Sequence, residues 1–202
     1  MTIYAIVNNL VKEHSSANAD NATWVILSPS GILQGGNPYF VPDFSNHFEA
    51  RLALAVKIGK LGKGVAPRFV HRYVDTVAPA LVFVASDMLA SLRDAGLPWT
   101  QAISYDKCTA LGKFTNIPYE DIENCKVGLR LSSSSAEMLT EWSGKDMNPC
   151  LETAISQISR DNTLKTGDII LLGLSAEGPE VRPDLRAVLM LNGAPCLKFN
   201  IR

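Results

Sequence analysis

Apolar residues along the chain occur mainly in short runs or in alternation with polar ones, a pattern typical of β-strands. Glycine, proline, asparagine and aspartate separate these runs. The predicted strands span residues 2–8, 22–28, 49–59, 80–85, 126–132 and 167–175. The longest apolar run, APALVFVA at residues 78–85, suits a buried strand and is far too short to cross a bilayer.

The end of the chain gives the clearest local signal. Residues 185–202 read LRAVLMLNGAPCLKFNIR, in which two strand-like segments flank Asn192 and Gly193. Asparagine followed by glycine tolerates the positive φ angles of a type I′ turn better than other dipeptides. The sequence therefore predicts a β-hairpin around this pair.

Helical spacing of apolar residues is found in three segments. The predicted helices span residues 66–77, 87–95 and 150–159. Pro67 suits the first turn of the first helix, whereas Ser86 caps the second and Gly96 ends it. Asn148 and Pro149 are expected at the cap and first position of the third. Residues 33–45, with two glycines and two prolines, are expected to form a loop.

Strands outnumber helices in this pattern, and hairpins outnumber βαβ units, which indicates a β-rich α+β fold. The chain shows no internal repeat or linker, so we expect residues 1–202 to form a single domain.

Composition narrows the possible classes of protein. The net charge is −1 without a long basic run, so neither nucleic acid nor a membrane is expected as a partner. Charged residues make up 19% of the chain, below the roughly 25% of an average soluble domain. Such a low value favours a buried interface between subunits.

Cysteine usage and the first residues bear on location. None of the cysteines, at 108, 125, 150 and 196, forms a C-x-x-C pair, which argues against a zinc site. The segment MTIYAIVNNLV lacks a basic leader and a small-residue cleavage site, so no secretory signal is expected. Reduced thiols in the cytoplasm are the expectation.

Two glycine-containing motifs partly resemble a phosphate-binding loop and a nucleophile elbow. GKLGKG, at residues 59–64, lacks the Lys-Ser/Thr that a phosphate-binding Walker loop needs, and is better interpreted as a turn. GLSAEG, at residues 173–178, has Glu177 where a nucleophile elbow needs glycine, and the following PEVRPD cannot form the helix after an elbow. A nucleophilic Ser175 is therefore not favoured.

The histidines are His14, His47 and His71, and none has a second histidine at metal-ligand spacing. His71 lies inside a predicted amphipathic helix and is interpreted as structural. His14 follows the first predicted strand, in a segment that is able to line a cleft.

Several segments together resemble the fumarylacetoacetate hydrolase family over nearly the whole chain. They are HFEARLALAVKIGK, VFVASDMLASLRDAGLPW, SYDKCTALGKF, TLKTGDIILLG and LMLNGAPCLKFNIR, in the family's order and spacing. The resemblance implies a mixed β-roll or sandwich with a few short helices, assembled as a homodimer. It also implies Mg²⁺ or Mn²⁺, which polarises 2-oxo or β-diketo acids for C–C cleavage, decarboxylation or isomerisation.

The family's metal ligands do not carry over intact. Its E-x-E motif falls on residues 49–51, where Glu49 keeps the first carboxylate and Arg51 replaces the second. Its D-x-x-x-R-D motif falls on residues 82–87, where Val82 replaces the metal-binding aspartate, Ser86 replaces the arginine, and Asp87 remains.

Three further family positions also differ. The family's lysine falls on Ile103, and its Thr-Gly-Thr-Pro turn reads Leu-Gly-Leu-Ser at residues 172–175. The Asn-Tyr-x-x-His pattern is blurred, because His14 lies five residues after Asn9 rather than four.

The substitutions predict a vestigial cleft rather than a metal centre. Residues 49 and 51 share a face of their strand, and a guanidinium has five donors and no acceptor, so Arg51 cannot replace a carboxylate ligand. An exposed ion pair without a role is the alternative for Glu49 and Arg51. The predicted cleft residues are Glu49, Arg51, Val82, Asp87, Ile103 and His14, and none is assigned a catalytic role.

Three functions stay open. The first is a non-catalytic family member without a cofactor, which binds a small carboxylate through Arg51 or regulates or pairs with an active relative. The second is an active hydrolase, decarboxylase or isomerase that holds Mg²⁺ or Mn²⁺ with other ligands, such as Asp87 and Glu49. The third is metal-free tautomerisation with Arg51 holding an oxyanion.

Overall fold

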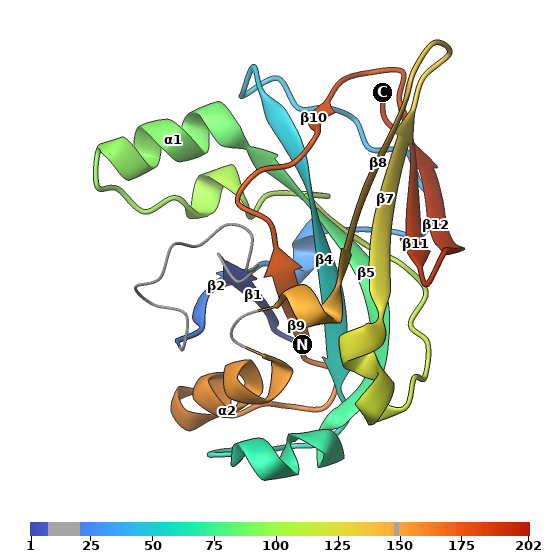
Figure 1. Cartoon of the computed structure of the whole chain (residues 1–202). Helices are drawn as coiled ribbons and strands as arrows, with labels where there is room; N and C mark the ends of the chain where they lie inside the picture. The colour runs from blue at the N-terminus through green and yellow to red at the C-terminus, as the bar shows by residue number, and fades with distance from the viewer. Residues whose placement is uncertain (8–20, 148–149) are drawn as a thin grey trace.

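The computed structural model describes residues 1–7, 21–147 and 150–202, and two β-sheets dominate it (Figure 1). The larger sheet contains β1 (Ile3–Val7), β2 (Thr23–Leu27), β3 (Ile32–Leu33), β4 (Phe48–Ile58), β5 (Val74–Ala85), β6 (Thr109–Leu111), β9 (Ile169–Leu174) and β10 (Glu180–Val181). Its order is β2-β1-β9-β4-β5-β6-β3, with β10 beside β4. This mixed sheet agrees with the predicted β-rich α+β class.

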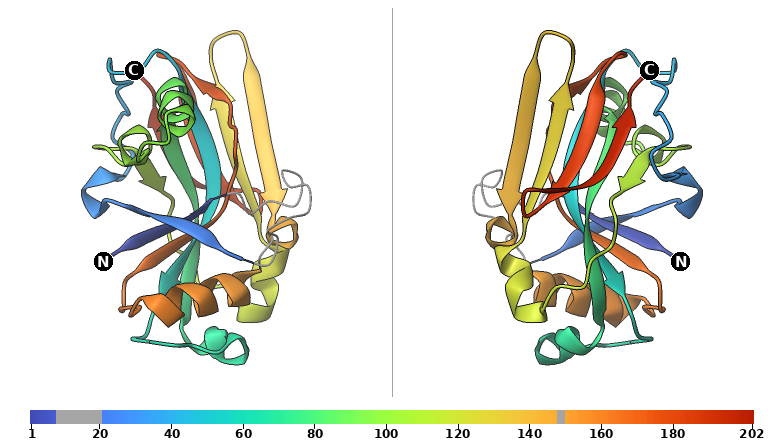
Figure 2. Two further views of the ribbon diagram at one scale, coloured as in Figure 1. Left: turned by 90° about the vertical axis from the view of Figure 1, so that its left-hand side faces the viewer. Right: turned by 90° about the vertical axis from the view of Figure 1, so that its right-hand side faces the viewer.

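The smaller sheet is antiparallel, in the order β12-β11-β7-β8. It consists of β7 (Lys126–Ser132), β8 (Glu137–Ser143), β11 (Arg186–Leu191) and β12 (Ala194–Asn200). Figure 2 shows it standing beside β4 and β5, with the β7–β8 hairpin reaching one end of the molecule. Asn192 and Gly193 have φ angles of 51° and 78°, which confirms the predicted turn between β11 and β12.

The long antiparallel pair of β4 and β5 forms the centre of the core. Its register runs from Phe48 opposite Ala85 to Ile58 opposite Val74, with one irregularity near Lys57. Every residue of β5 from Val77 to Ala85 is buried, because the pair is covered on both faces. Continuous apolar runs are therefore favoured here over alternation.

The two sheets also contact each other where β9 packs against β8. Gly173, with a φ angle of 67°, lies so close to the indole of Trp142 on β8 that an added Cβ would come within 2.3 Å of the ring. Glycine is therefore required here for its conformation and for its lack of a side chain.

Two α-helices, α1 (Ser86–Asp94) and α2 (Leu151–Asp161), lie on the side of the larger sheet away from the smaller one (Figure 1). Short 3₁₀ helices connect other elements, namely η2 (Pro29–Gly31), η3 (Pro67–Arg72), η4 (Thr100–Ala102), η5 (Tyr119–Asn124) and η6 (Gly144–Asp146). None of the helices in the described ranges combines the length and the apolar character needed to cross a bilayer.

The prediction of a helix over residues 66–77 was wrong. Only η3 is helical, and β5 begins at Val74. Thr76 and Val77 pair with Lys57 and Val56 of β4, and β-branched residues suit such a ladder better than a helix. The apolar spacing that suggested a helix is shared by the end of η3 and the start of the strand.

The ends of α1 and α2 were predicted within one or two residues. Gly96 has a φ angle of 65° and follows the C-cap of α1, as expected. Ser86, in contrast, is the first residue of α1 rather than its cap, because its backbone N–H extends the β4–β5 ladder to the carbonyl of His47. The N-cap of α2 is Cys150, and Asn148 and Pro149 lie outside the described residues.

Candidate functional site

The register of β4 and β5 brings together the positions that the family motifs single out. Arg51 lies directly opposite Val82, and Glu49 lies opposite Val84. Since alternate side chains share a face of a strand, all four project from the same face of the sheet. The motif alignment and the strand pairing thus identify one location.

Glu49 and Arg51 form an ion pair at that location. The Nε and Nη2 groups of Arg51 donate to the same oxygen of Glu49, Oε2, at 3.1 and 3.0 Å. The side chains are only 9% exposed for Arg51 and 13% for Glu49. The pair is therefore largely buried, in contrast to the exposed pair weighed as the alternative from the sequence.

The residues present do not fit a divalent metal at the family's position. A hard cation needs several oxygen ligands, but Arg51 presents hydrogen-bond donors and the fully buried Val82 presents methyl groups. Within the described ranges, no three histidine, cysteine, aspartate or glutamate residues are grouped closely enough to hold a metal.

Asp87 accepts hydrogen bonds from three groups at the start of α1 and in the residues before β4. It accepts from the Ser45 hydroxyl, from the Asn46 backbone N–H at 3.1 Å and from the Met88 backbone N–H at 2.7 Å. The Ser45 hydrogen bond is the main reason that the pKa of Asp87 is lowered, and it outweighs partial burial. The Asp87 carboxylate thus anchors the start of α1 to the loop that precedes β4.

A small cavity lies beside the ion pair. It has a volume of about 10 Å³, close to the minimum that holds one water molecule. The described residues that line it are Val7, Arg51, Val84, Leu89, Arg93, Trp99, Ile103, Leu174 and Ser175. Ile103, at the family's lysine position, contributes an apolar wall and no proton-transfer group.

Arg93 adds a second positive charge to the cavity lining. Its guanidinium carbon lies 4.9 Å from the centre of the Trp99 ring, a distance typical of a cation–π contact. Arg93 was not among the cleft residues predicted from the sequence. Its spacing of four residues from Leu89 on α1, which places both on one helix face, is the signal that would have identified it.

The segment 175–181 covers the edge of β4 beside the ion pair. The backbone N–H of Ala50 donates to the carbonyl of Pro179 at 2.9 Å, and Glu180 pairs with Glu49. A Cβ at Gly178 would lie 2.3 Å from the carbonyl oxygen of Ala50. The close backbone approach at Gly178 was not anticipated, although Gly-Pro before a short strand is a recognisable signal.

The histidines take different places. His47, two residues before Glu49, contacts the Ser86 hydroxyl through Nδ1, and its carbonyl accepts from the Ser86 backbone N–H. His71 belongs to η3, not to an α-helix, and its ring meets the edge of Tyr119. The predicted cleft residue His14 lies outside the described residues.

The chain is similar to proteins of known sequence and structure over nearly its full length. A family model described as fumarylacetoacetate (FAA) hydrolase C-terminal matches residues 2–195. The bovine (Bos taurus) mitochondrial oxaloacetate tautomerase FAHD1 is 27% identical over 194 residues, which cover 95% of this chain and 86% of the relative. The protein of the same name from Arabidopsis thaliana is 30% identical over 180 residues, 88% of this chain and 79% of the relative.

Solved structures agree with the fold. A fumarylacetoacetate hydrolase family protein of Yersinia pestis superposes with a TM-score of 0.87 at 22% identity, covering 100% of this chain and 92% of that chain. A fumarylpyruvate hydrolase of Pseudomonas aeruginosa, solved with Mn²⁺ and pyruvate, has a TM-score of 0.83 at 15% identity, covering 100% and 89%. Together with the family match over residues 2–195, these similarities establish that the chain belongs to the fumarylacetoacetate hydrolase family.

Proposed function

We propose that this chain is a non-catalytic family member that binds a small carboxylate at Arg51 without a divalent metal. The observation that supports this is the buried Glu49–Arg51 pair opposite Val82. A dication about 4 Å from a fixed guanidinium would be repelled by several kcal/mol even at an effective dielectric near 20. Such a protein acts by binding, alone or paired with an active relative.

Arg51 and Arg93 supply the attraction for an anionic ligand. Both line the same cavity, whose other described walls are largely apolar, so their charges are less screened than in open water. The cavity in its present volume is smaller than a carboxylate. Binding therefore requires that the exposed Arg93 side chain move off Trp99 and admit the ligand.

Calorimetric titration with oxalate in the presence of a chelator tests this proposal. Oxalate is expected to bind one-to-one, and titration with Mg²⁺ or Mn²⁺ alone is expected to give no tight site. The double variant Glu49→Gln with Arg51→Met removes both charges of the pair together, so neither of the two is left buried without the other, and it is expected to lose oxalate binding. Arg182→Gln, which removes an exposed arginine paired with Glu180, serves as the control.

Tight one-to-one binding of Mg²⁺ or Mn²⁺ by the unmodified protein would contradict the proposal. So would oxalate binding that survives in the double variant. Circular dichroism confirms that each variant is folded before its titration is interpreted.

Metal-free tautomerisation of a 2-oxo acid is the second candidate, favoured by the relatives named oxaloacetate tautomerases. In this reaction a proton leaves C3 and another is added to the oxygen on C2, and Arg51 would hold that oxygen as its negative charge develops. Keto–enol conversion of oxaloacetate, followed by ultraviolet absorbance after chelator treatment, separates the candidates. Conversion faster than in buffer, and lost in the double variant, would favour tautomerisation over simple binding.

A cytoplasmic location is also part of this proposal, based on the unpaired cysteines. The tautomerases above are named mitochondrial. Cell fractionation with an antibody against the chain distinguishes the two compartments.

A further inference from the structure

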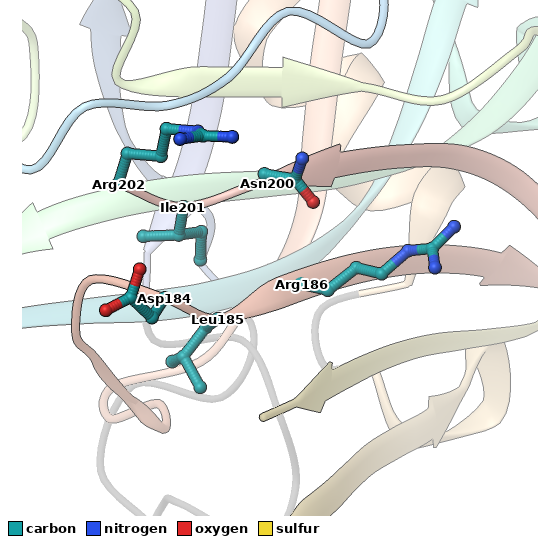
Figure 3. A pocket seen from close by; sticks show the side chains of 6 residues that line it. All are labelled: Asp184, Leu185, Arg186, Asn200, Ile201 and Arg202. Carbon is teal, nitrogen blue, oxygen red and sulfur yellow. The ribbon is translucent and has the colours of Figure 1, made fainter. Parts of the chain in front are cut away.

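The arginines of the chain differ in whether another side chain engages them. Arg51, Arg130, Arg160 and Arg182 pair with carboxylates, whereas Arg68, Arg72 and Arg93 stack on aromatic rings. Within the described residues, Arg186 and Arg202 have neither kind of contact. Both line the same hollow, which is on the smaller sheet and separate from the Glu49–Arg51 cavity (Figure 3).

The strands place the polar groups of this hollow on one face. Arg186 on β11 lies directly opposite Asn200 on β12, and Arg202 follows Asn200 by two residues, so the three side chains share a face. Figure 3 shows Asn200 between the side chains of Arg202 and Arg186, and the carboxylate of Asp184 on the side of Arg202, away from Arg186. The hollow has a volume of about 240 Å³.

The backbone that carries these side chains is fixed by hydrogen bonds. The N–H of Arg202 donates to the carbonyl of Tyr39 at 2.8 Å, and its own carbonyl accepts from Val41 at 2.8 Å. Ile201, between the polar residues, is fully buried and donates to Leu185 at 2.7 Å. Binding would therefore order only the arginine side chains and not the chain that bears them.

A second hollow extends the positive surface. It has a volume of about 310 Å³, shares Arg186 with the first, and is also lined by Lys198 and by the Arg130–Glu137 ion pair, so Lys198 supplies the additional positive charge. Lys198 lies on the same face of β12 as Asn200, two residues earlier. A ligand with a second anionic group is thus able to reach from one hollow into the next.

The charge and shape of these donors indicate the class of ligand. A guanidinium presents a planar fork of N–H groups that matches two oxygens of a carboxylate or phosphate. A carboxylate carries one charge and occupies one fork, whereas a phosphate dianion balances both arginines and also accepts from the Asn200 amide. We propose that the hollow between Arg186 and Arg202 binds a dianionic phosphate group, either inorganic phosphate or the phosphate of a small phosphomonoester.

Calorimetric titrations of the full chain at low ionic strength test this site. Inorganic phosphate, glycerol 3-phosphate and pyrophosphate are the probes, and acetate is the monoanion control. Phosphate is expected to bind one-to-one and more tightly than acetate, and pyrophosphate more tightly still because its second group reaches Lys198. Tighter binding of glycerol 3-phosphate than of phosphate identifies a phosphomonoester as the natural ligand, and equal binding identifies phosphate itself.

Single variants decide whether the two arginines carry the binding. Arg186→Gln and Arg202→Gln are each expected to weaken phosphate binding about tenfold or more, in line with the loss of a charge-assisted hydrogen bond. Both residues are exposed, so the variants are expected to fold. Arg160→Gln, which removes an exposed arginine on α2 and one unit of charge, is expected to leave binding unchanged.

Three results would overturn the proposal. Equal weakening in Arg160→Gln would show a response to overall charge only. Unchanged affinity in both arginine variants would place the phosphate elsewhere. A lower assembly mass of Arg186→Gln in sedimentation would identify this face as an interface between copies of the chain instead.

Discussion

At the scale of single residues, the cleft depends on which side chains face one another across the β4–β5 pair. Arg51 faces Val82 and reaches back to Glu49, so the charge of one residue satisfies the other. Removing one partner of a buried pair typically costs about 3–5 kcal/mol, because the remaining charge is left without compensation. Substituting both residues of the pair together is therefore a less destabilising way to change this site than substituting one.

Introducing carboxylates at both altered family positions is predicted to create a metal site. Arg51→Glu with Val82→Asp places three carboxylates on one face of β4 and β5, which repel one another until a cation joins them. The melting temperature of this double variant is expected to rise with Mn²⁺, whereas that of the unmodified protein stays constant. Thermal denaturation with and without Mn²⁺ measures the effect.

Arg51→Glu alone, with two carboxylates, is the matched control and is expected to show a smaller Mn²⁺ effect. A double variant that folds but melts at the same temperature with and without Mn²⁺ would show that these positions do not map onto the family's ligands.

The Ser45–Asp87 hydrogen bond predicts a pH-dependent contribution to stability. Because the Ser45 hydroxyl lowers the pKa of Asp87 in the folded state, its contribution is full above the unfolded pKa of roughly 3.9. It is lost as the pH falls through the folded pKa. Urea unfolding of Ser45→Ala should therefore show reduced stability at pH 7 and a difference from the unmodified protein that shrinks below about pH 4.

Ser30→Ala supplies the control for this comparison, since among the described residues the Ser30 hydroxyl bonds to the hydroxyl of Ser28 and to no carboxylate. Its effect on stability should be independent of pH. A Ser45→Ala difference that persists unchanged at low pH would contradict the assigned role of Asp87.

At the scale of elements, the segment 175–181 joins β9 to the edge of β4 and contributes Ser175 to the cavity. Its position depends on the close contact of Gly178 with the Ala50 carbonyl. Backbone contacts at Gly178 and Pro179 thus help to hold the element that covers the cleft.

Gly178→Ala is predicted to displace this segment. The added methyl group must move away from the Ala50 carbonyl, at an expected cost of about 1–3 kcal/mol in the free energy of unfolding, with altered oxalate binding. Gly35→Ala is the control, because no atom lies within 4 Å of its Cβ position and its φ is not in the left-handed region. Equal stability of the two variants in urea unfolding would show that the segment is not fixed at Gly178.

At the scale of the whole molecule, apolar side chains remain on the surface. Residues more than half exposed include Phe40, Leu61, Leu97, Met138 and Leu139. Charged residues make up only 19% of the chain, below the roughly 25% of an average soluble domain, which is the feature that favours a buried interface between subunits.

A homodimer is accordingly predicted. The chain mass of 21.9 kDa implies an assembly of about twice that value in sedimentation at micromolar concentration, a state whose buried interface lowers the exposed apolar area. A single species at the chain mass would contradict this prediction.

The sequence anticipated the parts of this molecule that depend on local pattern. Buried runs such as residues 80–85 and the Asn192–Gly193 turn were predicted correctly, because burial on both faces and positive φ angles each leave a distinct signature. Pairing between strands that are distant in the sequence leaves no such local signature. For that reason the start of β5 at Val74 was mistaken for a helix, and the exposed edge strand β8, whose polar and apolar residues do not alternate, was not predicted.

The site divides in the same way. The family motifs located Glu49, Arg51 and Val82, and strand pairing then explained why they belong together. Arg93 and Gly178 were missed, because their roles arise from tertiary contacts with Trp99 and Ala50. Asp87 was retained from the motif, but its hydrogen bonds to Ser45 and Asn46 could not be inferred from spacing.

The contact between Gly173 and the Trp142 indole constrains the order in which the two positions can change over evolutionary time. Any side chain at 173 would collide with the ring while tryptophan remains, so a smaller residue at 142 has to be acquired first, and the left-handed φ angle at 173 still disfavours most other amino acids afterwards. Sequences that carry alanine or serine at 173 should therefore have already lost the tryptophan, and the reverse order should be rare.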